Sequence, residues 1–197
     1  MNAITNVLNP RQQFYQSIFN TASGRVINLD NPTREMINIE DIANSLSKKC
    51  LFGGHTSHFY SFAQHSVLVA KMIESSQPTK KGRHLLEALL HNASKAYLGD
   101  FIKPVEKTLH PVFKRIRHAI AAKFGLNQSA RTQALINKYE SKAMELERIA
   151  FQEGNTEPLI AEFKKYGLYL GGASNWSVLD AKLLFLKTFK EMGVGVD

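Results

Sequence analysis

Apolar residues recur every three or four positions along most of the chain, the pattern of amphipathic α-helices. A stretch at 23–32 instead alternates apolar and polar residues and ends in Asn-Pro, which predicts a short strand or hairpin arm. The sequence therefore predicts an all-α helical bundle with a minor β-hairpin-like element near the N-terminus, in a single domain over 1–197. We expect helices over 10–20, 38–48, 60–75, 83–96, 111–124, 129–152, 156–166 and 176–192.

Polar residues and a proline indicate where some of these helices begin. Pro10 suits the first turn of the first helix. Asn38 is a favourable N-cap, and Asp41 stands three positions later as in a capping box. The last helix is expected to be capped by Ser174 or Asn175.

Composition narrows the class of protein. With 197 residues, of which 44% are hydrophobic, the chain is long enough for a substantial core. Its one cysteine, Cys50, excludes an internal disulfide and a multi-cysteine zinc site, and favours a reducing compartment. No apolar run approaches the ~18 residues of a membrane span, and no signal peptide is evident. We expect a soluble, cytoplasmic protein without a membrane partner.

The net charge of +8, from 25 Lys and Arg against 17 Asp and Glu, favours an anionic partner. A nucleotide, a nucleic acid or an acidic protein would all satisfy it. The basic residues are scattered, however, in pairs such as Lys48-Lys49, Lys80-Lys81 and Lys164-Lys165, and the densest group lies on the amphipathic segment 111–124. Solvated helix faces are the favoured explanation of this distribution, so the charge does not choose among partners.

Two of the seven histidines interrupt apolar helical stripes. His65 shares the inward stripe of 60–75 with Phe62 and Val69, and His91 follows the apolar run 85–90. A buried imidazole needs a hydrogen-bond partner or a metal ion, so both interpretations stay open. The remaining histidines are expected on polar surface: His55, His58, His84, His110 and His118. His55 and His58, which belong to the glycine-bearing loop 50–58, are also placed to line a pocket.

The runs GGHTSHFYSFAQHSVLVA and ALLHNASKAYLGDFIKP resemble, in order and spacing, the motifs of the HD-domain metal-dependent phosphohydrolases. The branch most similar to the chain contains bacterial 5′-deoxynucleotidases and small phage and bacterial HD proteins. The resemblance extends from about residue 23 to the final NWSVLDAKLLFLKTF. It implies a helical bundle around a central pocket, and a homodimer would be usual.

In that family a histidine, an adjacent His-Asp pair and a distant aspartate hold the metal. Imidazole and carboxylate ligands suit Mn²⁺, Co²⁺ or Mg²⁺, which polarise a phosphoryl oxygen and lower the pKa of bound water. The resemblance assigns these positions to His65, His91, Asn92 and Glu140, the last by counting back seven residues from Glu147. Asn92 and Glu140 thus replace two aspartates of the family pattern.

Further positions also depart from the pattern. Lys95 occupies the place of the catalytic glutamate, whereas Asp100 of the Gly-Asp pair is retained. Leu51 and Asn44 stand where the family usually has an arginine and a histidine. The resulting substrate-binding set comprises Lys95, Asp100, His55 and His58, and no confident catalytic residue remains.

Asn92 in place of an aspartate and Lys95 in place of a glutamate together make the expected site about three charge units more positive. An ammonium on Lys95 about 6 Å from a divalent ion would repel it by ~5 kcal/mol at an effective dielectric of 20. We therefore expect no bound cofactor, and we expect Lys95 to pair with Asp100 or Glu140, because a buried unpaired cation is costly. Such a pair would replace the metal as a link between helices.

Three functions remain open. The first is a degenerate HD-type protein, inactive or weakly active, which binds a nucleotide or another small anion. The second is an active nucleotide phosphohydrolase that uses Mn²⁺, Co²⁺ or Mg²⁺. The third is a protein-interaction or regulatory module with an inert pocket.

Overall fold

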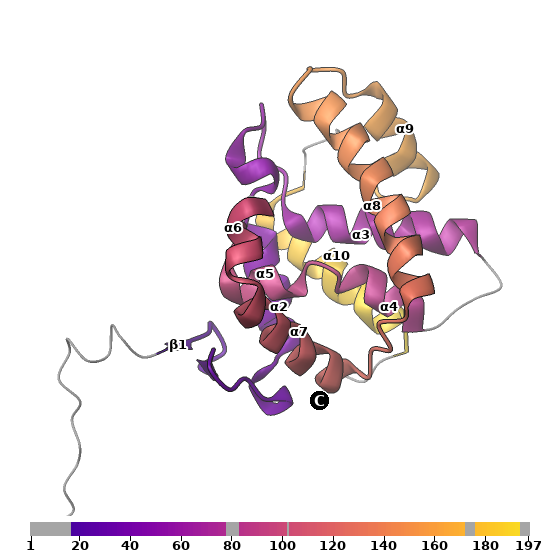
Figure 1. The fold of residues 1–197 in the computed structure, drawn as a ribbon. Coiled ribbons are helices and arrows are strands. Elements are labelled where there is room, and N and C mark those ends of the chain that lie inside the picture. Colours follow the sequence, from indigo (N-terminus) through magenta and orange to yellow (C-terminus); the bar gives the residue numbers. More distant parts are fainter. Residues whose placement is uncertain (1–16, 78–82, 102, 172–175, 194–197) are drawn as a thin grey trace, which may run out of the picture.

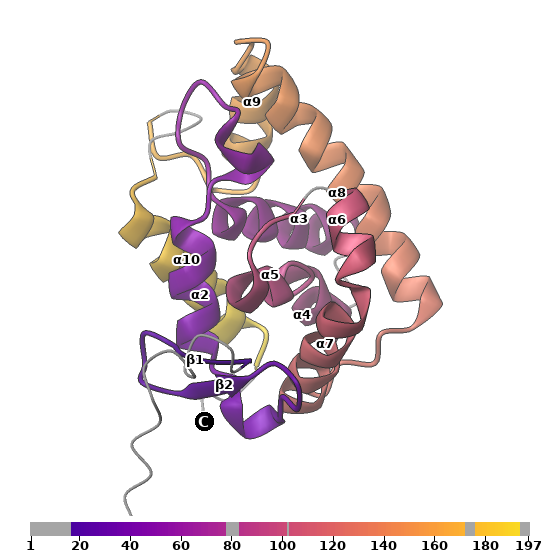
Figure 2. The ribbon, with the colours of Figure 1, turned by 60° about the vertical axis from the view of Figure 1, so that its left-hand side comes forward.

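The computed structural model describes residues 17–77, 83–101, 103–171 and 176–193. Within these ranges helices surround a buried apolar core and one two-stranded antiparallel sheet lies at the edge, which confirms the predicted all-α bundle with a minor hairpin (Figure 1; Figure 2). None of the described helices combines the length and apolar character needed to cross a membrane. The elements are β1 (Ile18–Asn20), β2 (Val26–Asn28), the 3₁₀ turns η1 (Arg34–Met36) and η2 (Leu51–Gly54), and the helices α2 (Ile39–Lys48), α3 (Phe62–Ser76), α4 (Arg83–Leu89), α5 (Ala93–Leu98), α6 (Lys103–Thr108), α7 (His110–Phe124), α8 (Ala130–Phe151), α9 (Glu157–Lys165) and α10 (Val178–Glu191).

Helix α3 runs through the middle of the bundle, in contact with α2, α4, α8 and α10 (Figure 1). Its first nine residues are all buried. A capping box fixes its start: the Ser61 hydroxyl accepts a hydrogen bond from the Gln64 backbone N–H, and the Gln64 side chain accepts one from Ser61 N–H. Cap and burial together hold His65, one turn later, inside the molecule.

The predicted helix over 10–20 is wrong at its C-terminal end, where Ile18–Asn20 forms β1; the rest of that helix, including Pro10, lies outside the described residues. β1 pairs with β2 in the register Ile18↔Asn28, Phe19↔Ile27 and Asn20↔Val26. The pairing brings Ile27 of β2 into the core, where it is completely buried. The burial gained by forming the hairpin outweighs the helical spacing of apolar residues in the segment that contains β1.

The predicted helix over 83–96 is broken into α4 and α5. In a continuous helix the carbonyl of Ala88 would accept a hydrogen bond from the backbone N–H of Asn92. Here that carbonyl accepts from Nδ1 of His91 instead, at 2.6 Å. The side chain thus competes with the helical ladder, the chain turns at His91-Asn92, and α5 begins at Ala93.

The predicted N-cap of α2 is confirmed, but the capping box is not. Asn38 Oδ1 accepts a hydrogen bond from Glu40 N–H at 2.9 Å. The carboxylate of Asp41 turns away and accepts from the backbone N–H and hydroxyl of Ser23, at 2.9 and 2.6 Å. It therefore fastens the hairpin to α2 instead of closing the helix end.

Helices α7 to α10 begin and end within two residues of their predicted bounds, whereas the short helix α6 was not predicted. The cap of α10 differs: Ser177 accepts from Asp180 N–H in a capping box, whereas the predicted caps Ser174 and Asn175 lie outside the described residues. The pair Lys80-Lys81 also lies outside them.

Candidate functional site

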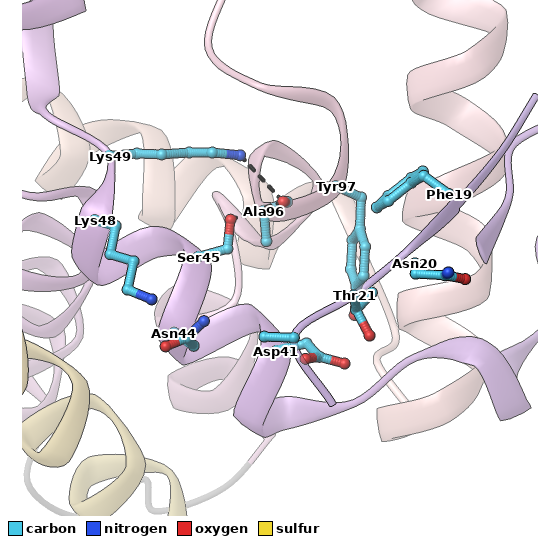
Figure 3. A pocket seen from close by; sticks show the side chains of 11 residues that line it. Phe19, Asn20, Thr21, Asp41, Asn44, Ser45, Lys48, Lys49, Ala96 and Tyr97 are labelled. Atoms are coloured by element: carbon cyan, nitrogen blue, oxygen red, sulfur yellow. Dashed lines mark hydrogen bonds between the residues drawn. The ribbon is translucent and has the colours of Figure 1, made fainter. Parts of the chain in front are cut away.

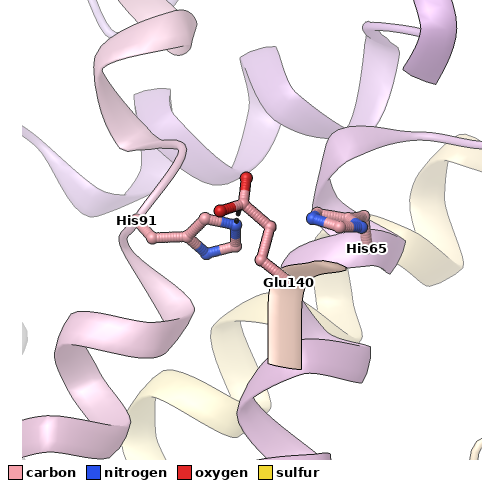
Figure 4. Close-up of side chains that lie close together, drawn as sticks. All are labelled: His65, His91 and Glu140. Carbon is pink, nitrogen blue, oxygen red and sulfur yellow. Dashed lines mark ion pairs between the residues drawn. The ribbon is translucent and has the colours of Figure 1, made fainter. Parts of the chain in front are cut away.

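Three of the four predicted metal ligands meet at one point, contributed by three separate segments. α3 supplies His65, the turn between α4 and α5 supplies His91, and α8 supplies Glu140 (Figure 4). One ligand atom of each lies within 4.8 Å of those of the other two, and the imidazole centroids are 5.3 Å apart. Such a set of two imidazoles and one carboxylate has the composition of divalent-metal sites.

His65 is fixed by a carboxylate that the sequence did not single out as functional. Its Nδ1 lies 2.8 and 3.0 Å from the two carboxylate oxygens of Glu147, and both side chains are buried. Burial alone would lower the pKa of His65, but the charge and hydrogen bond of Glu147 outweigh it and raise that pKa. With Nδ1 engaged, Nε2 is the nitrogen left for a ligand, as in carboxylate–histidine–metal arrangements.

Two signals pointed to Glu147. It lies seven residues after Glu140, and this spacing places both carboxylates on the same face of α8. A buried histidine on α3 also required a partner from another element. Neither signal identifies which of several acidic residues on α8 reaches His65, because that depends on how the two helices pack.

His91 is held as a neutral imidazole. Its Nδ1 donates to the Ala88 carbonyl, so Nε2 carries the lone pair, which accepts a hydrogen bond from the Asn92 amide at 2.7 Å. Burial, and then the charge of His65, lower the pKa of His91 to about 3. Its Nε2 lies 3.9 Å from a Glu140 oxygen, and since His91 is neutral near pH 7 this contact joins two electron-pair donors.

Asn92 does not point an oxygen at the predicted site in this arrangement, because its amide N–H faces His91. A metal ion at Nε2 of His91 would displace this hydrogen bond, at a cost of about 1 kcal/mol. The amide would have to rotate before its oxygen served as a ligand.

Lys95 forms the predicted ion pair with Asp100, at 2.5 Å, and its ammonium lies 4.5 Å from the centroid of the Phe62 ring. Gly99, at φ 91°, allows the chain to reverse after α5 and bring Asp100 back to Lys95. The expected link between helices is wrong, however, because both partners belong to α5 and the residues that follow it. No ion pair between Lys95 and Glu140 is found among the described residues.

The three convergent side chains lie in the wall of a cavity of about 1230 Å³. Of the predicted substrate-binding residues, Lys95, Asp100 and His55 line this cavity. His58 does not: it is exposed, and its Nδ1 contacts the Ser57 hydroxyl at 3.1 Å. Leu51, at the family's arginine position, is buried and adds apolar surface, whereas Asn44 lines a different cavity.

The other histidines agree only in part with the predicted polar surface. His110 and His118 are exposed, as expected. His84 is half-buried, and its Nε2 is enclosed without a hydrogen-bond partner among the described residues.

Carboxylates outnumber cations on the described wall of this cavity, four against two. One of the two cations, Lys95, pairs with Asp100, and the other, Arg117, pairs with Glu106 at 2.5 Å. Glu87 accepts hydrogen bonds from two backbone N–H groups of the α7–α8 connection. Glu140 is the remaining carboxylate; beyond its contact with neutral His91, it has no cationic partner among the residues that the structure describes.

Comparison with known proteins places the chain in a family. No family model matches it. It is 34% identical over 148 residues to the protein YfdR of Escherichia coli (strain K12), an alignment that covers 73% of this chain and 79% of YfdR. It is also 37% identical over 110 residues to the Rhodobacter capsulatus protein RCAP_rcc00048, which covers 53% of this chain and 56% of that protein. Neither name states an activity. The chain therefore belongs to the same family as YfdR.

Proposed function

We propose that the central cavity binds a divalent metal ion and, with it, the phosphate group of a nucleotide, in an HD-type phosphohydrolase-like protein that hydrolyses its ligand weakly or not at all. One observation carries this proposal. Three potential metal ligands converge from three segments: His65, His91 and Glu140. Two of their lone-pair donors, His91 Nε2 and a Glu140 oxygen, lie 3.9 Å apart. A cation between them would replace the Asn92 hydrogen bond at His91 Nε2 and would supply Glu140 with the positive partner that it lacks among the described residues.

The charges of the cavity favour a metal more than the sequence suggested. The expected repulsion of ~5 kcal/mol assumed an unpaired ammonium on Lys95. Asp100, 2.5 Å away, neutralises that ammonium, so most of the repulsion is cancelled. The surplus of carboxylates on the wall also favours a cation over a free anion. Two imidazoles with one carboxylate suit Mn²⁺ or Co²⁺ better than Mg²⁺.

The cavity then offers a place for a phosphorylated ligand. Its volume of about 1230 Å³ exceeds the ~300–1,000 Å³ of ordinary small-molecule sites, so a nucleotide fits. When bound, the metal would polarise a phosphoryl oxygen and lower the pKa of a water molecule. Lys95 is placed to contact a second phosphate oxygen, since an ammonium has three donors and can contact a ligand with one while another stays on Asp100.

Slow hydrolysis follows from the loss of the resembled family's glutamate and from the engagement of the carboxylates on the described wall, where Glu106 is paired with Arg117. Lys95 stands where the resembled family has a glutamate, and an ammonium has no lone pair with which to accept a proton. Asp100 is held by Lys95, and Glu87 holds backbone amides. Glu140 is used as the ligand. Losing a general base lowers turnover typically 10²–10⁴-fold.

Metal binding is tested by thermal unfolding with millimolar Mn²⁺ or Co²⁺. At 100 times its dissociation constant, a ligand specific for the native state stabilises it by about 2.7 kcal/mol, or roughly 5–10 °C for a chain of this size. His91→Ala should abolish this increase, whereas His118→Ala, at an exposed histidine of α7, should keep it. If wild type shows no increase with either ion, the metal proposal fails.

The nucleotide is tested next, with metal-loaded protein and a panel of deoxynucleoside mono- and triphosphates. We expect saturable binding that requires Mn²⁺ or Co²⁺, with little release of phosphate. Rapid turnover that disappears in His65→Ala would contradict the proposal that hydrolysis is weak, and would show that the protein is an active phosphohydrolase. Tight metal binding without any nucleotide binding would contradict the proposal that the ligand is a nucleotide.

A further inference from the structure

A second cavity, of about 290 Å³, lies between the β-hairpin, α2 and α5 (Figure 3). Both residues of the pair Lys48-Lys49 line it, together with Asn44. Neither His65, His91 nor Glu140 contributes to its wall, so it is distinct from the candidate metal site. α5 separates the two cavities: Lys95 faces the larger one, and the next two residues line the smaller one.

Lys49 has a structural role in this wall. Its ammonium donates to the backbone carbonyls of Lys95 and Ala96, the latter at 3.0 Å. The Ser45 hydroxyl donates to the same Ala96 carbonyl at 2.8 Å. The Lys95 carbonyl also accepts a hydrogen bond from the backbone N–H of Gly99, so Lys49 and Ser45 add further partners to the carbonyls at the end of α5. Lys49 is half-buried, and this burial lowers its pKa.

Lys48 and Asn44 have no such role. Neither side chain forms a hydrogen bond or ion pair with any residue in the described part of the chain. They stand four residues apart on α2 and therefore share one face of it. Figure 3 shows the Lys48 side chain lying along α2 in the direction of Asn44. An ammonium and an amide side by side, both free, form a recognition pair for an anion.

The charge of the wall also favours an anion. Two lysines face one acidic residue, Asp41, and the carboxylate of Asp41 is already held by two donors of Ser23. The opposite side of the cavity is aromatic. Phe19 of β1 and Tyr97 of α5 line it, and the Tyr97 hydroxyl is engaged by the backbone of Asn38, so its ring is what remains for a ligand.

We propose that this cavity is a second ligand site, which binds a small phosphate monoester carrying a flat ring. The phosphate would contact Lys48 and Asn44, and the ring would pack on Phe19 and Tyr97. The volume lies just below the ~300–1,000 Å³ usual for small-molecule sites, which excludes a nucleoside triphosphate. This inference is independent of metal binding in the larger cavity.

Phenyl phosphate is the probe, titrated into the ¹⁵N-labelled full chain in the presence of a chelator and followed by NMR. We expect saturable shifts confined to the amides around residues 44–49 and 96–97, with a dissociation constant near the millimolar range that one lysine and one ring support. Inorganic phosphate, which lacks the ring, should bind at least tenfold more weakly. The same titration of His91→Ala should be unchanged, which separates this site from the larger cavity.

Lys48→Gln should weaken phenyl phosphate at least tenfold, and Phe19→Ala should weaken it without changing the affinity for inorganic phosphate. Lys187→Gln, at an exposed lysine of α10, is the control for loss of one positive charge and should leave binding intact. Shifts that do not saturate, or an affinity unaffected by Lys48→Gln, would overturn the proposal. Lys48 would then serve only as a cation at the C-terminus of α2.

Discussion

The buried pair between His65 and Glu147 should make Glu147→Gln one of the most destabilising conservative substitutions in the chain. The replacement keeps the size of the side chain and removes its charge. Both partners are essentially inaccessible to solvent, and the nearest contact is 2.8 Å. The His65 imidazole, whose pKa Glu147 raises, would lose the carboxylate that accepts from its Nδ1–H, and a new amide N–H₂ would need acceptors in the core.

The magnitude follows from the burial. A buried hydrogen bond to a charged group typically contributes about 1.5–3 kcal/mol. Glutamine keeps an oxygen that can accept from Nδ1 of His65, but it lacks the charge and leaves a buried amide N–H₂ without an acceptor, so the upper end applies, about 3 kcal/mol. For a chain of 197 residues that corresponds to a decrease of roughly 6–12 °C in the midpoint of thermal unfolding.

The free energy of unfolding is measured by urea denaturation at pH 7 with a chelator present. Glu145→Gln is the matched control, because Glu145 lies on the same helix but is exposed and pairs with Arg148 at the surface. We expect this control to leave the midpoint unchanged. Equal stability of the two variants would refute the assignment of Glu147 as the partner that holds His65.

A second measurement separates a positioning role from a purely structural one. Residues that orient a metal-binding histidine contribute about 10–100-fold to metal affinity. The Mn²⁺ dissociation constant of Glu147→Gln, measured at a temperature where the variant is folded, should rise by that factor. If Glu147→Gln does not fold, Glu147→Asp is the alternative. It keeps the negative charge but has a shorter side chain, so it tests the same contact with His65.

Three further predictions follow from other contacts. Asp41→Asn removes the carboxylate that accepts two hydrogen bonds from Ser23, and should lower the free energy of unfolding by about 1–3 kcal/mol, measured in urea. Because the pKa of His91 is about 3 in the folded chain against 6.5 in the unfolded one, the unfolded state binds the proton first. The metal-free protein should therefore lose about 1.4 kcal/mol per unit as pH falls from 6.5 towards 3, a slope that His91→Gln should reduce. Asn92→Asp combined with Lys95→Glu should tighten Mn²⁺ binding, measured by calorimetry, and increase phosphate release, measured by a colorimetric assay. The same double variant should be less stable than wild type without metal. An unchanged Mn²⁺ affinity would contradict the assigned metal site.

Much of the fold is predictable from the chain alone, because amphipathic helices are encoded locally. The apolar period of residues 60–75 and 129–152 reproduced α3 and α8 to within two residues, and both helices lie where their apolar stripes face a common core. The two interrupted stripes also singled out His65 and His91 as residues that need partners. The prediction that Lys95 pairs with Asp100 came from the geometry of the resembled family, and the two residues prove to be a local pair, five positions apart.

The features that local periodicity missed depend on contacts between distant segments. Ile18–Asn20 becomes a strand only because β2 is available beside it and Ile27 enters the core. The break between α4 and α5 depends on where the ring of His91 is directed, and a helical repeat does not report this.

The site itself was decided by tertiary packing. His65 and Glu147 are 82 residues apart, and nothing in either local segment selects this carboxylate over its neighbours on α8. The packing of α8 against α3 selects it, because only a side chain on the buried face of α8 reaches the imidazole. Amino-acid types and periodicity determined which groups needed a partner in the interior; the distances between helices determined which partner each received.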